Sequence, residues 1–220
     1  MILTPVDRVS LPALLEAFAC AVAGDPLASA VFGRIAAVVP GGDLLTLSTD
    51  PLHHAQGAEL CREFGFGLAD VDPQDYFTWD GERVATRMEP SVLIHEVGHF
   101  QCCAPSRRPV LDFGLGAGPE TGRKAEANAV QSVFGVDADV EEGLSSLLGI
   151  LWEAELGQPA LLGFLEQNWL EGGASPHNIA HFRKMVRMLD RQGLIDAQGG
   201  PTRALRAMED EEFFAAWRVL

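Results

Sequence analysis

The chain has 220 residues, a hydrophobic fraction of 47% and a formal net charge of −15. This size and composition are ordinary for a globular protein with one well-filled core, and we expect residues 1–220 to form a single domain. The acidic balance argues against nucleic acid as a partner, because a phosphate backbone would be repelled. No apolar run reaches the roughly 18 residues that a membrane span needs, so no membrane partner is expected.

The N-terminal segment predicts a helix and not a secretory leader. Charged residues at positions 7, 8 and 16 interrupt its apolar residues, and Leu11, Leu15 and Phe18 recur at helical spacing. The four cysteines show no CxxC pairing and indicate reduced thiols. We therefore expect a cytoplasmic protein.

The other elements follow in chain order. Helices are predicted over residues 26–38, 51–66, 91–103, 123–134, 144–169 (broken at 157–159), 175–192 and, in part, 201–220. Two short apolar runs flank Asp80-Gly81 and predict a β-hairpin over Tyr76–Met88, whereas residues 107–122 predict a loop. The expected fold class is α+β, mostly helical, with a small antiparallel β element beside the helix of residues 91–103.

That helix contains the motif HExxH, formed by His95, Glu96 and His99. Residues four apart lie on the same face of a helix, so both imidazoles can meet one ion. Glu96 lies on the adjacent stripe, where it could act on a water molecule or hold a ligand in place. The alternative is a helix with two ordinary histidines, which would be costly to bury side by side without a partner. The motif therefore predicts a metal site.

A divalent ion needs a third protein ligand, and a carboxylate on the next helix is the usual source. Glu126 is predicted because its helix can hold it rigidly and its neighbouring alanines permit close packing. Glu120 in the loop and Asp112 are the alternatives. Two histidines and one carboxylate serve both zinc hydrolases and non-haem iron oxygenases, so the ligand set leaves both reactions open.

The residues that follow the motif favour one of the two. Phe100, Arg107-Arg108 and Asp112-Phe113-Gly114 follow HExxH at offsets that resemble, without a gap, the elongation factor P hydroxylase family. Specific similarity covers about residues 82–134. The resemblance implies a non-haem Fe(II)-dependent monooxygenase that uses O₂ and hydroxylates a lysine on a translation factor.

Carried over to this chain, the resemblance assigns two groups of residues. The metal ligands are His95, His99 and Glu126. The candidate catalytic or site-ordering residues are Glu96, Arg107, Arg108 and Asp112, with a surface ion-pair cluster as the alternative for the last three. The family has aromatic residues where this chain has LGAGPETG, residues 115–122. We therefore expect a divergent member, with a flexible loop as a lid and a substrate that is a small amine, an amino acid or a lysine on a protein.

A second resemblance keeps another reaction open. HEVGH followed by KAEANAV is similar to gluzincin-type metallopeptidases, in which the same three ligands would bind zinc and Glu96 would activate water. His177 and His181 are also four apart, and we expect a helix-face pair without a ligand role. A protein that keeps a closed metal site and binds a partner is the non-enzymatic alternative.

Overall fold

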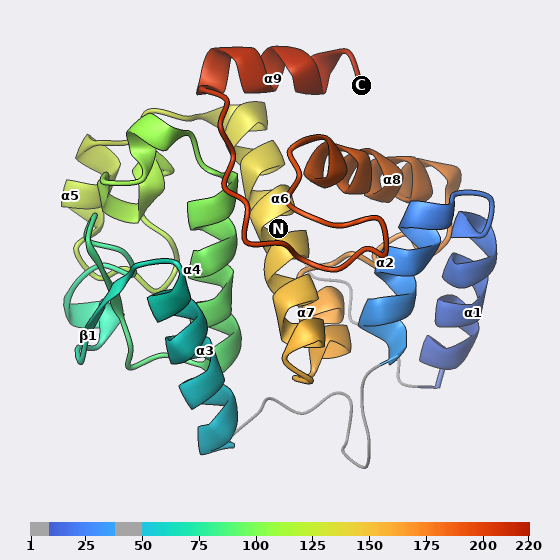
Figure 1. The fold of residues 1–220 in the computed structure, drawn as a ribbon, viewed down its shortest axis with the longest axis horizontal. Coiled ribbons are helices and arrows are strands. Elements are labelled where there is room, and N and C mark those ends of the chain that lie inside the picture. The colour runs from blue at the N-terminus through green and yellow to red at the C-terminus, as the bar shows by residue number, and fades with distance from the viewer. Residues whose placement is uncertain (1–8, 38–49) are drawn as a thin grey trace. The chain divides into compact units, whose positions relative to one another are not determined.

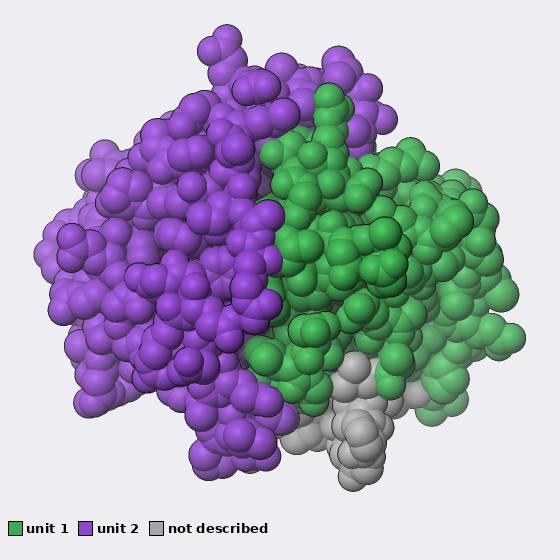
Figure 2. Space-filling model, in the orientation of Figure 1, with its two compact units in different colours: residues 1–47, 150–202 green, residues 48–149, 203–220 purple. Residues whose placement is uncertain are grey.

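The computed structural model describes residues 9–37 and 50–220. Positions 7, 8 and 38, which enter the predictions above, lie outside this part of the chain. The described residues are mostly helical, with a very small sheet. Contacts divide the chain into two compact units, shown in green and purple in Figure 2: residues 1–47 with 150–202, and residues 48–149 with 203–220. The single domain over residues 1–220 stays a prediction.

The first unit is helical and is built around aromatic side chains. Its helices are α1 (Leu11–Val22), α2 (Pro26–Ala37), α7 (Ala160–Glu166), α8 (Pro176–Arg191) and the last residues of α6 (Gly135–Glu155). Neighbouring rings have centroids between 4.7 and 6.0 Å apart in the cluster of Phe18, Phe32, Phe164 and Phe182. Full burial of one such side chain contributes about 1.5–3 kcal/mol, so this cluster contributes substantially to the stability of the unit. The predicted helices at 26–38 and 175–192 are confirmed.

The second unit contains the predicted motif. Its elements are α3 (Pro51–Glu63), β1 (Gly67–Ala69), η1 (Pro73–Asp75), β2 (Arg83–Ala85), α4 (Pro90–Cys102), η2 (Pro105–Arg107), η3 (Leu111–Gly114), α5 (Lys124–Ala129), the first part of α6, and α9 (Asp210–Arg218). Figure 1 shows α3 alongside α4. Prolines at the first helical positions start both helices, and Asp50 caps α3 by accepting from the Leu52 amide at 2.9 Å. The predicted helices at 51–66 and 91–103 are therefore confirmed.

The antiparallel element was predicted wrongly, because the sheet is parallel. β1 and β2 pair from Gly67 opposite Arg83 to Ala69 opposite Ala85. The chain does turn at Asp80-Gly81, and one antiparallel bridge joins Trp79 to Val84. The turn signal was therefore local, and the strand pairing came from a segment outside it.

The predicted hairpin stops after one bridge because the backbone amides that would extend it bond elsewhere: those of Thr86 and Arg87 donate to the carbonyls of Ala69 and Val71, at 2.9 and 3.2 Å. The Asp80 carboxylate accepts from the amides of residues 82 and 83, at 3.0 and 2.7 Å, which occupies the start of the second strand. Before the turn, Trp79 forms two hydrogen bonds with Asp112. The Asp112 amide donates to the Trp79 carbonyl at 3.1 Å, and the Trp79 amide donates to the Asp112 carboxylate at 3.3 Å. The segment before the turn thus pairs with η3.

Two further helix boundaries differ from the prediction. α5 ends at Ala129 and not at residue 134, and α6 begins at Gly135 and not at residue 144. Gly135 has a φ of 57°, which glycine adopts without strain. Asp137 in the first turn of α6 complements the positive end of the helix dipole. None of the described helices combines the length and apolar character that crossing a membrane requires.

Candidate metal centre

α4 presents the two histidines of the motif on one face, as the spacing predicts. The ring centroids of His95 and His99 lie 4.5 Å apart, edge to face. Both side chains are largely buried, with 18% and 10% of their surface exposed. The Nδ1 atoms of both rings are buried without a hydrogen-bond partner in the described part of the chain. Two such imidazoles are unusual in a protein interior, because buried polar atoms are normally bonded.

Glycines let α4 and α6 approach each other closely at this face. A β-carbon at Gly98 would lie 2.4 Å from the Ser145 carbonyl oxygen on α6, which is closer than carbon and oxygen can come without bonding. A β-carbon at Gly149 would lie 3.3 Å from the Cα of His95. Only glycine therefore fits at position 98, and the close approach brings the histidine face of α4 against α6.

The carboxylate that meets the histidines is Glu142 of α6. Its Oε1 lies 3.2 Å from Nε2 of His95, and its Oε2 lies 3.4 Å from Nε2 of His99. One donor atom from each of the three residues lies within 4.8 Å of the others. A set of two imidazole nitrogens and one carboxylate oxygen suits zinc or iron. The three residues, His95, His99 and Glu142, form a histidine–glutamate group that can hold a metal ion.

Electrostatics within this group are strongly coupled. Burial opposes the charged form of each residue, but the facing carboxylate of Glu142 outweighs it at His95 and raises the pKa of that imidazole to about 8. Burial, together with the charge on His95, lowers the pKa of His99 to about 4. The two histidines bring the pKa of Glu142 down to about 2, although packing against them partly desolvates its carboxylate. His99 and Glu142 are thus in the neutral and ionised forms that metal ligands need.

Glu96 lies beside the pair and is also buried, with 5% of its surface exposed. Burial is the main reason that its pKa rises to about 8; the charges of Asp112, Glu142 and Glu120 add to the shift, and His95 opposes it. A carboxyl group of this kind holds a proton near neutral pH and can exchange it with a neighbouring group.

Arg107 does not belong to a surface ion-pair cluster but to a buried network. Its guanidinium donates to Glu141, to Asp210 at 2.7 and 2.9 Å, and to the carbonyl of Phe113. Only 4% of Arg107 and none of Glu141 is exposed. Removing one partner from such a network typically costs about 3–5 kcal/mol, because the remaining charge is left buried.

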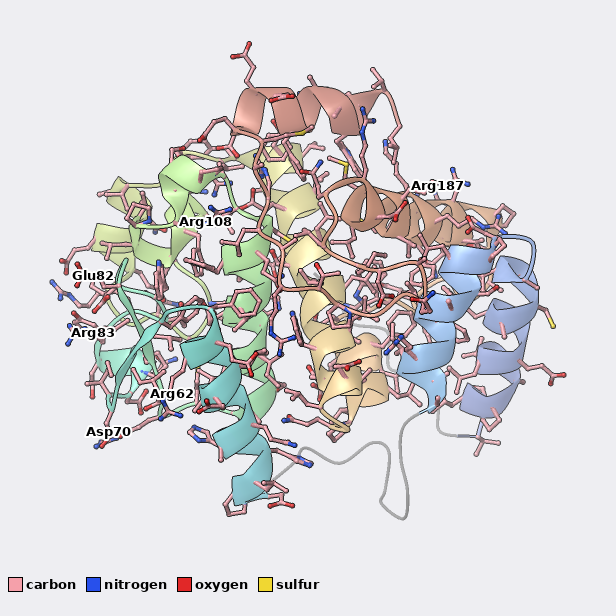
Figure 3. The ribbon with its side chains drawn as sticks, viewed as in Figure 1. Arg62, Asp70, Glu82, Arg83, Arg108 and Arg187 are labelled. Carbon is pink, nitrogen blue, oxygen red and sulfur yellow. The ribbon has the colours of Figure 1, made fainter. Side chains whose placement is uncertain are left out.

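Arg108 has a different role at the end of α4. Its guanidinium donates to the carbonyl oxygens of Phe100 and Arg206, and it lies over the Phe100 ring with 5.6 Å from Cζ to the centroid. Figure 3 labels it beside α4. The side chain therefore binds the helix end to the C-terminal segment, and it does not join the histidine–glutamate group.

Asp112 accepts several of the hydrogen bonds that hold the loop after the motif helix. Its carboxylate accepts from the hydroxyls of Thr78 at 3.0 Å and Thr121 at 2.6 Å, besides the amide of Trp79. These bonds close the loop of residues 112–121 at its base. The Gly122 amide further donates to the carbonyl of Pro73 at 2.8 Å. The glycine-rich segment is thus attached at several points.

The Asp-Phe-Gly triplet has a backbone conformation that residues other than glycine rarely adopt. Asp112, Phe113 and Gly114 have φ values of 41°, 54° and 71°, all in the left-handed region. Such conformations cost about 1–3 kcal/mol each in non-glycine residues and persist where the surroundings enforce them. The turn directs the Phe113 ring onto Trp79, at 5.3 Å, and onto the imidazole of His99, at 5.6 Å. The strained turn thereby supports one of the histidines.

The structure does not bring Glu126 to the histidine pair. Its side chain is 52% exposed on α5, and it accepts from Arg123 at both carboxylate oxygens. Glu120, the alternative in the loop, is half-buried and lies near enough to raise the pKa values of His95 and Glu96. Of the carboxylates weighed from the sequence, Glu120 and Asp112 therefore lie near the site, and Glu126 does not.

Glu142 was missed because the prediction began its helix at residue 144. The sequence does contain a signal: VEEGLSSLLGIL places two adjacent glutamates before a run of small and apolar residues. Acidic residues that precede a buried, glycine-containing helix face are candidates for a partner inside the protein. Glu141 and Glu142 are such residues.

Other histidines do not join the group. His181 stacks on Trp169 with 5.8 Å between centroids, and burial with the nearby positive charges lowers its pKa. His54 Nε2 lies 2.7 Å from the carbonyl oxygen of Thr86. Neither His177 nor His181 belongs to the candidate metal group found in the described residues.

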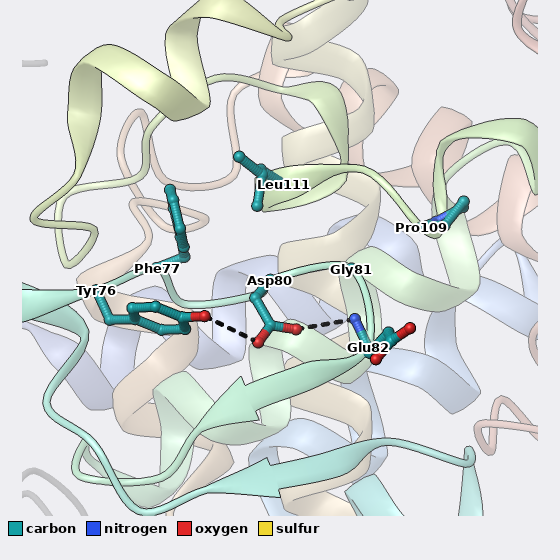
Figure 4. Close-up of a pocket in the computed structure, with 7 residues that line it drawn as sticks. All are labelled: Tyr76, Phe77, Asp80, Gly81, Glu82, Pro109 and Leu111. Atoms are coloured by element: carbon teal, nitrogen blue, oxygen red, sulfur yellow. Dashed lines mark hydrogen bonds between the residues drawn. The ribbon is translucent and has the colours of Figure 1, made fainter.

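A surface pocket of about 290 Å³ lies in the same unit (Figure 4). It is lined by Tyr76, Phe77, Asp80, Gly81, Glu82, Pro109 and Leu111. The Asp80 carboxylate is already bonded to the Tyr76 hydroxyl, at 3.3 Å, and to two backbone amides. None of the lining residues belongs to the histidine–glutamate group, so we do not place the chemistry in this pocket.

Comparison with known proteins gives no further constraint. No family model, no curated protein and no solved structure matches the chain. The family resemblance thus rests on residues 95–114 and their neighbours, and it stays a prediction.

Proposed function

We propose that the protein is a non-haem Fe(II)-dependent, O₂-using monooxygenase that hydroxylates an amine-bearing or amino-acid-type substrate. The observation that supports this most strongly is the burial, around the histidine–glutamate group, of Arg107, Asp112 and Phe113, the signature residues of the family resemblance. Phe113 stacks on His99, and Arg107 binds Glu141, the neighbour of Glu142 on α6. A surface cluster with the same sequence would have no such contacts, so the signature and the metal site form one structural unit.

His95, His99 and Glu142 would hold the ion, and three protein ligands are the number that leaves coordination positions open in catalytic centres. When bound, Fe(II) supplies the reductive activation of O₂. Glu96 holds a proton beside the ligands, because burial raises its pKa to about 8. The hydroxylation also consumes two electrons from an external reductant.

The charge around the site supports a cationic substrate. Glu142 and Glu120 both act electrostatically on His95, and the whole chain has a net charge of −15. An aliphatic amine is protonated at neutral pH and would be attracted by these carboxylates. A lysine on elongation factor P, which the family resemblance implies, and a free amine or amino acid both have this charge.

The proposal is tested by oxygen consumption and product mass. Fe(II)-loaded protein with ascorbate as reductant is expected to consume O₂ above background with lysine, small amines or lysyl-modified elongation factor P, and to add one oxygen atom to one of them. His95→Ala, treated identically, measures chemistry from unbound iron. Equal O₂ consumption by both proteins with every substrate would contradict the proposal.

A zinc-dependent gluzincin-type metallopeptidase is the second candidate, and the position of Glu96 favours it. A buried carboxyl group beside two histidines is what such an enzyme uses to activate water. However, the segment that carries this resemblance contains Glu126, which is paired with Arg123. Peptide cleavage by the zinc form, lost in Glu96→Gln, together with no O₂ consumption by the iron form, would establish the peptidase instead.

A further inference from the structure

Arg206 is a fully buried arginine in the segment that leads to α9. Its guanidinium donates to four groups: the carbonyl of Cys102 at 2.9 Å, Glu141 Oε2 at 3.1 Å, Asp210 Oδ1 at 2.8 Å and the carbonyl of Met208 at 2.8 Å. Its Cζ also lies 3.7 Å from the centroid of the Phe213 ring. A guanidinium with this many partners has a fixed position, because its donors point in set directions.

Two of these partners belong to the helices that carry the candidate ligands. Cys102 is the last residue of α4, and Glu141 immediately precedes Glu142 on α6. The backbone strengthens the link to α4: the Arg206 amide donates to the Gln101 carbonyl at 2.9 Å, and the Gln101 side chain donates to the Ala204 carbonyl at 2.7 Å. The C-terminal segment thus connects the ends of α4 and α6 on its way to α9 (Figure 1).

We propose that Arg206 is a positioning residue for the metal centre. By joining the end of α4 to Glu141, it fixes how Glu142 approaches the histidines. The inference rests on the metal centre proposed above, and it gives the C-terminal segment a role that the sequence alone did not indicate.

The geometry of α6 explains why a hold on Glu141 matters. Successive residues of an α-helix differ by about 100° in direction, so fixing Glu141 also fixes the direction of Glu142. Glu142 itself is 58% exposed, whereas Glu141 is fully buried. Only Oε2 of Glu141 is bonded, to Arg107 and Arg206, and Oε1 has no partner in the described residues. The direction of Glu142 thus depends on two arginines.

Arg206→Lys tests the inference, because lysine keeps the positive charge but cannot span the same set of partners. We expect the dissociation constant for Co(II), measured by chelator competition, to rise about 10–100-fold, as for other residues that orient metal ligands. The visible absorption bands of bound Co(II) should shift, since they report ligand geometry. Glu141→Gln keeps the side-chain size and should show the same effects; it serves as the test if the lysine variant does not fold.

Arg218→Gln is the matched control. Arg218 on α9 also pairs with an acidic residue of α6, Asp137 at 2.7 Å, but this pair is open to solvent, with 58% and 30% of the two side chains exposed. Arg218→Gln should leave both the dissociation constant for Co(II) and the absorption spectrum of bound Co(II) unchanged. If wild-type protein binds Co(II) and the folded Arg206→Lys or Glu141→Gln protein matches it in both measurements, the positioning role is refuted and the metal centre stands. If wild-type protein binds no Co(II), the metal centre itself fails, and the inference with it.

Discussion

Glu142→Ala is expected to weaken metal binding by more than the 10–100-fold that loss of an outer residue typically costs, because it removes one of three protein ligands. Its two carboxylate oxygens lie 3.2 and 3.4 Å from the Nε2 atoms of the histidines, and the structure places no other carboxylate in the candidate metal group. Equilibrium dialysis against Zn(II), Co(II) or Fe(II), followed by elemental analysis, measures the effect.

Glu126→Ala is the control for this experiment. Glu126 was the ligand expected from the sequence, and it is paired with Arg123 on the exposed face of α5. We expect metal binding by Glu126→Ala to equal that of the wild-type protein. The opposite pattern, with binding lost in Glu126→Ala and retained in Glu142→Ala, would restore the prediction made from the sequence.

Gly98→Ala is expected to have the second large effect, this time on stability as well. The new methyl group would lie 2.4 Å from a backbone oxygen of α6, and a backbone atom cannot move aside as a flexible side chain can. α4 and α6 must separate, at a cost of about 1–3 kcal/mol or more in the free energy of unfolding. The separation also moves Glu142 away from the histidines, so metal binding should weaken.

Gly33→Ala provides the comparison for Gly98→Ala. Gly33 lies within α2, and a β-carbon there would meet no atom within 4 Å. Alanine is favoured over glycine in helices by about 1 kcal/mol, so this variant should be slightly more stable than the wild-type protein. Thermal unfolding followed by circular dichroism measures both variants. A Gly98→Ala protein as stable as Gly33→Ala would contradict the close packing of α4 and α6.

The histidine pair was predictable because its information is local. Residues four apart on a helix share a face whatever surrounds the helix, so His95 and His99 needed no knowledge of the tertiary structure. The helix itself was equally readable from Pro90 and the apolar residues around the motif. The turn at Asp80-Gly81 was found for the same reason.

The third member of the candidate metal group could not be found in this way, because it depends on which helices pack together. Glu142 meets the histidines because Gly98 and Gly149 allow α4 and α6 to approach closely. The sequence around each glycine does not indicate which helix packs against it. Arg206 lies still farther along the chain and reaches Glu141 through the C-terminal segment. The prediction of the sheet was wrong for a related reason: β1 pairs with β2 from outside the predicted hairpin.

The places of the signature residues were predictable only in part. Their spacing singled them out, and the structure places Arg107 and Asp112 in buried networks next to the ligand helices. Their contacts are with Glu141, Thr121 and backbone carbonyls, which the sequence did not indicate. Arg107 and Asp112 thus belong to the buried structure around the candidate metal centre, and the proposed function gives the proton-exchanging role to Glu96.

The central claim is that two histidines meet one ion through their Nε2 atoms. Long-range ¹H–¹⁵N NMR of histidine-labelled, metal-free protein, titrated with diamagnetic Zn(II), tests it directly. Of the six histidines in the chain, two should show changed Nε2 resonances that are complete at one equivalent, and both should be absent from the spectra of a His95→Ala/His99→Ala protein. Unchanged Nε2 resonances of these two histidines at saturating Zn(II), or changes confined to His177 and His181, would contradict the account.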